Sequence, residues 1–348
     1  MGKLLWQRPV FFNRNRVYRV YLGGKLFHGF LGDKDEDGFH PEEWVASTVH
    51  AMNANSTGPL EGISIVEGTE IPFTQLLEEH REDCLGDRDT LGVLVKYLDS
   101  AIRLPMQVHP TRDFSKKHFG SPYGKAESWV ILDTRPDACI YYGFSRQVSR
   151  EEFEAAVDKS LEDKSCMTEF VNRVPVKPGD VFFVPAGVIH AIGAGCLMLE
   201  AQEPSDFTVQ PEHWCGEHKL SDYEMYLGLP RETANDCFDF SRYGDDVIKK
   251  GKKQPKCISE TSNTKLESLI DEDDTECFSV KRLTVSGGSA PLEEGAAVHI
   301  VAQGRGVVRC GDFVREVKKG DYFFLPVSAA AEAFVDGDVE LLICKGGK

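Results

Sequence analysis

The chain has 348 residues, a length that suggests about two domains at roughly 150 residues per domain. Its 40 basic and 56 acidic residues give a net charge of -16, the wrong sign for a protein that neutralises nucleic-acid phosphates or coats an anionic membrane. The first eight residues lack the apolar core of a signal peptide, and no run of 18 apolar residues follows, so we expect no membrane span and a cytoplasmic location. Ten cysteines without a C-x-x-C pair favour reduced, buried thiols.

Two segments predict helices, and most of the remaining chain predicts strands. Over residues 89–103 the apolar side chains fall on one helical face: Leu91, Leu94, Val95, Leu98 and Ile102. Ser149 followed by Glu152 has the capping-box pattern, which predicts a helix beginning there. The other apolar runs are short and bounded by Gly, Pro and Asp, which predicts strands over 129–132, 139–142 and 181–184.

A polar segment divides the chain into two unequal units. Residues 249–276 are charged and contain Gly and Pro, so we interpret them as a linker between an N-terminal unit, 1–248, and a C-terminal unit, 277–348. An internal repeat supports this division, because the pattern of residues 177–190 reappears over 318–331. The first copy ends at His190 and the second at Ala331, so a ligand at His190 would leave the second unit without a site.

The spacing of Gly179, Pro185, Gly187 and His190 resembles the second signature of the cupin family, whose fold is a small double-sheet jelly-roll β-barrel. The resemblance implies a mostly β chain of two cupin domains with a few inserted helices. The N-terminal domain would bind metal. The C-terminal domain would be a degenerate cupin without a metal site that packs against the first.

Four further segments make the resemblance more specific. They are E-W-V-A-S at 43–47, Q-V-H-P at 107–110, G-K-A-E-S-W at 124–129 and L-E-A-Q at 199–202. Together with P-A-G-x-x-H-A at 185–191 they resemble the class I mannose-6-phosphate isomerases in their shorter bacterial form, over nearly the whole chain. The resemblance implies an aldose–ketose isomerase that uses one Zn²⁺ per chain and interconverts mannose 6-phosphate and fructose 6-phosphate. Its partner would be that small phosphorylated sugar, with no nucleic acid or membrane.

The resemblance places the metal on four residues: Gln107, His109, Glu127 and His190. Gln107 and His109 are two residues apart, so on a strand they share a face, whereas Glu127 and His190 come from other strands. One amide oxygen, two imidazoles and one carboxylate suit Zn²⁺. Taken singly, a hydrogen-bonded structural histidine or a paired buried glutamate is the alternative for each.

The same resemblance suggests catalytic residues. Isomerisation needs a base that moves a proton between C1 and C2, and an electrophile that stabilises the enediolate. Lys125 matches the family's active-site lysine and could donate to substrate oxygens, the alternative being a solvated surface lysine. Glu200 could orient the substrate or relay protons, or serve as a structural ion-pair partner. Asp206 also matches the family pattern, with a turn residue as its alternative.

Two positions depart from the family. Pro105 stands where the family usually has a serine associated with the substrate phosphate, and Gln210 stands at the place of a catalytic arginine. Glutamine carries no charge and cannot clamp an anion as arginine does. Sequence offers four other cations for the missing charge: Arg14, Arg112, Lys116 and Lys117.

These departures leave three functions open. The first is the isomerase. The second, favoured by Pro105 and Gln210, is a metal-containing cupin that binds or senses a sugar with little isomerase activity, or that acts on a related sugar. The third, an iron oxygenase, is weaker because its usual H-x-H pair is here Gln107-x-His109. Four other histidines have no motif to support them and are expected to be structural or exposed: His118, His213, His218 and His299.

Overall fold

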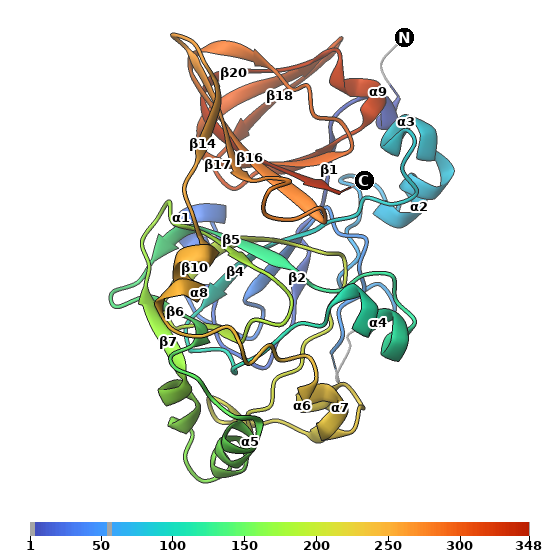
Figure 1. The fold of residues 1–348 in the computed structure, drawn as a ribbon. Helices are drawn as coiled ribbons and strands as arrows, with labels where there is room; N and C mark the ends of the chain where they lie inside the picture. Colours follow the sequence, from blue (N-terminus) through green and yellow to red (C-terminus); the bar gives the residue numbers. More distant parts are fainter. Residues whose placement is uncertain (1–3, 54–57, 348) are drawn as a thin grey trace.

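The computed structural model describes residues 4–53 and 58–347. Within them the chain is mostly β, as predicted, with the several antiparallel sheets of a cupin-like arrangement. Figure 1 shows two β bodies, one built mainly from the C-terminal strands, with the helices at the periphery. Among the described helices, none has both the length and the apolar character needed to cross a bilayer.

The larger sheet holds the C-terminal strands together with one strand from the other end of the chain. Among the described residues it has eight strands in the order β1-β19-β17-β20-β16-β15-β14, with β18 paired to β17. The strands are β1 (Val10–Phe11), β14 (Lys256–Glu260), β15 (Thr264–Ile270), β16 (Phe278–Pro291), β17 (Ala297–Cys310), β18 (Phe313–Lys318), β19 (Tyr322–Leu325) and β20 (Ala333–Gly346).

The second large sheet and two small ones make up the other β body. Seven described strands run in the order β13-β8-β5-β10-β4-β3-β2: β2 (Arg16–Val17), β3 (Glu42–Val45), β4 (Leu94–Ser100), β5 (Glu127–Thr134), β8 (Val181–Val184), β10 (Cys196–Gln202) and β13 (Lys252–Lys253). A three-stranded sheet, β7-β6-β9, contains β6 (Cys139–Phe144), β7 (Val171–Pro175) and β9 (His190–Ile192). β11 (Trp214–Cys215) pairs with β12 (His218–Lys219). The predicted strands 129–132, 139–142 and 181–184 are confirmed.

The helices are short. They are α1 (Phe27–Leu31), α2 (Phe73–Glu79), α3 (Arg81–Leu85), α4 (Arg112–Phe119), α5 (Arg150–Lys159), α6 (Asp222–Tyr226), α7 (Arg231–Asn235), α8 (Asp245–Gly251) and α9 (Val327–Ala330), with 3₁₀ turns at Leu5–Gln7 and Cys166–Phe170. The helix predicted from the capping pattern is confirmed as α5, because the Ser149 side chain accepts a hydrogen bond from the Glu152 backbone N–H. All ten cysteines are free, and of these Cys257 is exposed and Cys277 half-buried.

The helix predicted over residues 89–103 is wrong. Within this segment Leu94–Ser100 form the strand β4, and all seven residues of the strand are buried. Val95 and Tyr97 pack into one core while Leu98 packs into another on the opposite face, so apolar residues are needed on both sides of the strand. The match to a helical period was a consequence of this two-sided burial.

The segment predicted as a linker forms regular secondary structure instead. Residues 249–276 hold the end of α8 and all of β13, β14 and β15. Its charged residues suit exposed edge strands, since every residue of β14 is exposed. The boundary at residue 248 also fails to separate the sheets, because Val10 of β1 pairs with Phe324 of β19 and Lys252 of β13 pairs with Phe182 of β8.

The internal repeat corresponds to equivalent strands followed by different structures. Residues 181–184 form β8 and residues 322–325 form β19, each reached through a Gly with positive φ, Gly179 and Gly320. After β8 the chain turns into β9, which begins at His190. After β19 it enters α9, and Ala331 is the C-cap of that helix. The second copy therefore has neither a histidine nor a strand at this point.

The seven-stranded sheet has two different faces, and this positions the functional residues. Leu199 of β10 and Val130 of β5 point into a core shared with the C-terminal strands, including Val298 and Phe324. The alternate residues of the same strands, such as Trp129, point to the other face and into a second core that contains strands β6 and β9. Glu127 and Glu200 have the same parity and therefore project from this second face.

Gly23 packs directly against the end of β4. A Cβ atom at Gly23 would lie 1.7 Å from the backbone carbonyl oxygen of Asp99. Because the obstacle is backbone, we expect Gly23→Ala to lower the free energy of unfolding by about 3 kcal/mol or more in denaturant titrations. Gly29, inside α1, has nothing within 4 Å of such an atom, so Gly29→Ala should be neutral or slightly stabilising. Equal stability of both variants would contradict this packing.

His299 in β17 is a buried structural histidine, as expected. Its ring stacks on Phe323 with centroids 5.0 Å apart, and burial lowers its pKa to about 4. In the unfolded chain His299 takes up a proton below about pH 6.5, whereas in the folded chain it does so only below about pH 4. The free energy of unfolding should therefore fall by up to about 3 kcal/mol through this residue as the pH is lowered from 6.5 to 4. His299→Leu should remove that part of the acid destabilisation in denaturant titrations. An unchanged loss in the variant would contradict the assignment.

Candidate metal centre and adjoining cavity

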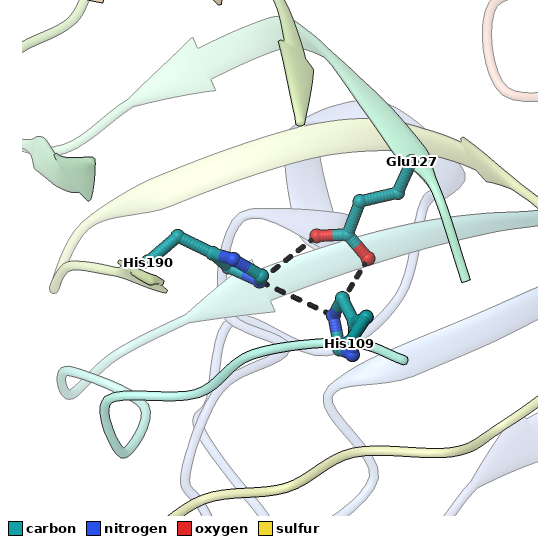
Figure 2. Close-up of side chains that lie close together, drawn as sticks. All are labelled: His109, Glu127 and His190. Atoms are coloured by element: carbon teal, nitrogen blue, oxygen red, sulfur yellow. Dashed lines mark hydrogen bonds and ion pairs between the residues drawn. The ribbon is translucent and has the colours of Figure 1, made fainter. Parts of the chain in front are cut away.

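Three of the predicted metal ligands form a buried cluster. Figure 2 shows the side chains of His109, Glu127 and His190 pointing toward one another. The Nε2 atom of His109 lies 3.1 Å from Glu127 Oε2, and the Nε2 atom of His190 lies 3.2 Å from Glu127 Oε1. The two Nε2 atoms are 3.2 Å apart. In the part of the chain that the structure describes, this is the one such convergence of three His, Cys, Asp or Glu ligand atoms, all within 4.8 Å.

Separate elements bring these ligands together. Glu127 begins β5 of the seven-stranded sheet, whereas His190 begins β9 of the three-stranded sheet. His109 lies in the segment that follows β4, where Gln107 forms an antiparallel bridge with His190. The Gln107 N–H donates to the His190 carbonyl (N···O 2.8 Å), and the His190 N–H donates to the Gln107 carbonyl (N···O 2.9 Å). Because directly opposed residues project to the same face, the side chain of Gln107 emerges beside that of His190.

The hydrogen bonds of both histidines orient them as ligands. The Nδ1–H of His190 donates to the Val188 carbonyl (2.8 Å), and the Nδ1–H of His109 donates to the Phe207 carbonyl (3.0 Å). A carbonyl can only accept, so the neutral tautomer of each ring that fits this hydrogen bond carries its lone pair on Nε2, inside the cluster. Burial, and next the Lys125 ammonium, lowers the pKa of His109 to about 3, which keeps this ring neutral.

A metal ion fits this donor set. Burial opposes ionisation of Glu127, but the Lys125 ammonium, 3.4 Å from Oε2, favours it and helps to hold the pKa of this carboxyl well below its usual range. Neither carboxylate oxygen has a hydrogen-bond donor among the described groups, although both are buried. A carboxylate and two imidazole lone pairs that face one another attract a cation, and two nitrogen ligands with one oxygen ligand suit a borderline divalent metal ion.

Lys125 lies at the edge of the cluster. Its ammonium donates to His109 Nε2 at 2.9 Å and lies 3.4 Å from Glu127 Oε2. The lysine is 4 % exposed, so it is not the solvated surface residue considered as its alternative. It joins the cluster to an adjoining cavity of about 160 Å³.

The cavity brings together all of the residues predicted to be catalytic. Its polar lining includes residues expected from the sequence, namely Gln107, Lys125, Glu200, Asp206 and Gln210. It also includes residues that sequence reasoning missed: Arg19, Glu42 and Lys96. Lys96 lies in the segment wrongly predicted as a helix. A single lysine within an apolar run was the sequence feature that could have indicated it. Glu42 directly precedes the quoted E-W-V-A-S motif.

Glu200 is held in a buried network. It accepts a hydrogen bond from the Trp129 indole N–H (3.1 Å), and its other oxygen lies 3.3 Å from the Lys96 ammonium. Burial and then the charge of Glu127 raise the pKa of Glu200, while Lys96 opposes the rise. Glu200 is therefore the ion-pair partner considered as its alternative, and it also forms part of the cavity wall.

Both departures from the family pattern lie at the cavity. Pro105 and Gln210 line it, and the Gln210 side-chain amide donates to the Glu224 carbonyl at 3.0 Å. The four cations suggested from sequence as substitutes are not among the described lining residues, and Arg112 instead pairs with Glu203. Arg19, Lys96 and Lys125 are the lysine and arginine residues among that lining.

The fold and the cluster together define a β protein with a buried candidate metal centre that opens into a polar cavity. No family model matches the chain. The chain is 32% identical over 347 residues to the mannose-6-phosphate isomerase ManA of Bacillus subtilis (strain 168), covering 96% of this chain and 98% of that protein. The chain belongs to the mannose-6-phosphate isomerase family.

Solved structures agree with this fold. The crystal structure of mannose 6-phosphate isomerase from Bacillus subtilis matches with a TM-score of 0.75 at 23% identity, over 97% of this chain and 99% of that one. A mannose 6-phosphate isomerase crystallised with zinc and yttrium matches with a TM-score of 0.72 at 15% identity, over 98% of this chain and all of the other.

Proposed function

We propose that this chain is a zinc-dependent aldose–ketose isomerase that interconverts mannose 6-phosphate and fructose 6-phosphate through an enediolate. The observation that supports the proposal most is the buried cluster of His109, Glu127 and His190, which adjoins a cavity lined by Lys125 and Glu200. Family membership indicates the sugar phosphate as substrate.

In this proposal Gln107, His109, Glu127 and His190 hold one Zn²⁺ per chain. When bound, the ion supplies an electrophile for an oxygen on which negative charge develops. The chain's own residues do the rest. The Lys125 ammonium, buried at the cavity wall, donates to substrate oxygens. Glu200, whose pKa is raised by burial and by Glu127, orients the sugar and relays protons.

The C-terminal cupin-like unit is proposed to carry no metal. Ala331 stands where His190 stands in the first unit, and it caps a helix rather than beginning a strand. Its sheet shares a core with the seven-stranded sheet through Val298, Ile300 and Phe324, which supports a packing role. Metal analysis giving two ions per chain, with the second lost in His299→Leu, would contradict this part.

A coupled assay of mannose 6-phosphate conversion, run with added Zn²⁺ beside unphosphorylated mannose, tests the proposal. We expect fructose 6-phosphate to form, and to form faster than fructose does from mannose. Conversion of mannose alone would replace the proposal with an isomerase of a related sugar. Tight binding of mannose 6-phosphate without conversion would favour the sugar-binding alternative, which Pro105 and Gln210 support.

A further inference from the structure

Arg19 connects three parts of the cavity wall. Its side chain is 13% exposed. The Nε–H donates to Glu42 on β3 (3.0 Å), and Nη1 donates to Asn53 Oδ1 (2.9 Å). Nη2 donates to both oxygens of Asp206, 187 residues away in sequence, at 3.1 Å each. The Met52 backbone N–H also donates to Asp206 (2.9 Å), so the segment after β3 is fixed to the segment after β10 through this one carboxylate.

Lys96 shares its carboxylates with Arg19. Its ammonium lies 3.3 Å from Glu200 and 3.9 Å from both Glu42 and Asp206. It also lies 4.8 Å above the Trp44 ring. Two largely buried cations therefore face three largely buried carboxylates, and Arg19 engages two of those three with the shorter contacts. Glu200 is left as the nearest partner of Lys96.

This division decides what the Lys96 N–H groups can do. An ammonium has three donors, and a lysine surrounded by three unneutralised carboxylates would direct all of them to protein oxygens. With Glu42 and Asp206 bound by Arg19, the lysine keeps donors for an oxygen atom in the cavity that it lines. The Arg19 guanidinium suits this task because its planar fork holds carboxylates in fixed positions.

We propose that Arg19 is a positioning residue that holds Glu42 and Asp206 so that Lys96 remains available to the sugar. The inference rests on the proposed function, in which this cavity binds the sugar phosphate. In this scheme Arg19 does not contact the substrate. It acts through Lys96 and through the part of the cavity wall formed by Met52, Asn53 and Asp206.

The test compares Arg19→Gln, Arg19→Lys and Arg135→Gln in the full chain loaded with Zn²⁺. Arg135 is the matched control, because it also binds two carboxylates, Asp37 and Asp99, but is not among the residues lining the cavity. Calorimetry gives the dissociation constant for mannose 6-phosphate, and turnover gives kcat/KM against pH. The unfolding midpoint records stability for each variant.

For Arg19→Gln we expect affinity and kcat/KM to fall at least about tenfold. The Arg19 charge lowers the pKa of Lys96, whereas Glu42, Asp206 and Glu200 raise it. Loss of Arg19 should therefore raise the pKa of Lys96 and move the alkaline limb of the pH profile, where Lys96 loses its proton, to higher pH. Arg19→Lys should recover part of both effects. Arg135→Gln should lose stability but keep the affinity and the pH profile.

Arg19→Gln with unchanged affinity and pH profile would overturn the inference, and so would Arg135→Gln with the same changes as Arg19→Gln. A parent chain that binds mannose 6-phosphate without turnover would contradict the proposed function alone, and the affinity of Arg19→Gln would then decide the inference. A parent chain that neither binds nor converts the sugar would contradict both.

Discussion

Replacing His190 with alanine is expected to remove most of the metal and nearly all activity. The Nε2 atom of this residue lies 3.2 Å from both Glu127 Oε1 and His109 Nε2, in the middle of the cluster. Loss of a partner that only orients a ligand costs about 10–100-fold in affinity or activity, so loss of a ligand should cost more than about 100-fold. Metal content per chain after dialysis and kcat/KM on mannose 6-phosphate measure the effect.

His299→Leu is the control for this variant. It also removes a fully buried histidine, but from the apolar interior of the C-terminal strands. Its metal content and kcat/KM should equal those of the parent chain. A His190→Ala protein that is folded, retains one ion per chain and isomerises the sugar at the parent rate would rule out the cluster as the metal centre.

Introducing arginine at Gln210 is expected to raise kcat/KM on mannose 6-phosphate by at least about tenfold. A preorganised charge that stabilises the enediolate or holds the phosphate is worth about 2–4 kcal/mol, or about 30- to 1,000-fold in rate. Gln210 lines the cavity and supplies no charge there. The lysines and arginine of the described lining are each within ion-pair distance of a carboxylate: Arg19, Lys96 and Lys125.

Gln147→Arg provides the matched control, since it adds the same charge at an exposed position outside the cavity. It should leave kcat/KM unchanged. A parent chain with kcat in the usual range of about 1–10³ s⁻¹ that Gln210→Arg slows or leaves unaffected would contradict the charge deficit at this position. The isomerase assignment itself would stand in that case.

Local sequence patterns predicted the parts of the fold that local interactions determine. The Gly-Asp turn and apolar run of residues 177–184 predicted β8, and the Ser149 and Glu152 pair predicted α5. Residues 89–103 misled because a strand buried on both faces carries apolar residues at every spacing, including the helical one. The segment 249–276 misled because exposed edge strands and linkers share a polar composition.

The candidate site was predictable where short motifs carry it and hidden where distant contacts do. The motifs around His109, Glu127 and His190 were sufficient to predict a cluster that the fold then assembles. Arg19 lies 187 residues from Asp206, and no local pattern relates the two. Their pairing depends on how the segment after β2 and the segment after β10 meet, which is a property of the whole sheet.

The most direct test of the account is a Zn²⁺ titration of chelator-treated chain with mannose 6-phosphate conversion as the readout. We predict that the stripped chain is inactive, and that the rate of fructose 6-phosphate formation rises in proportion to added Zn²⁺ until about one ion per chain is bound. A stripped chain without metal that converts the sugar at the untreated rate would contradict the account, as would a chain with one bound Zn²⁺ that forms no fructose 6-phosphate.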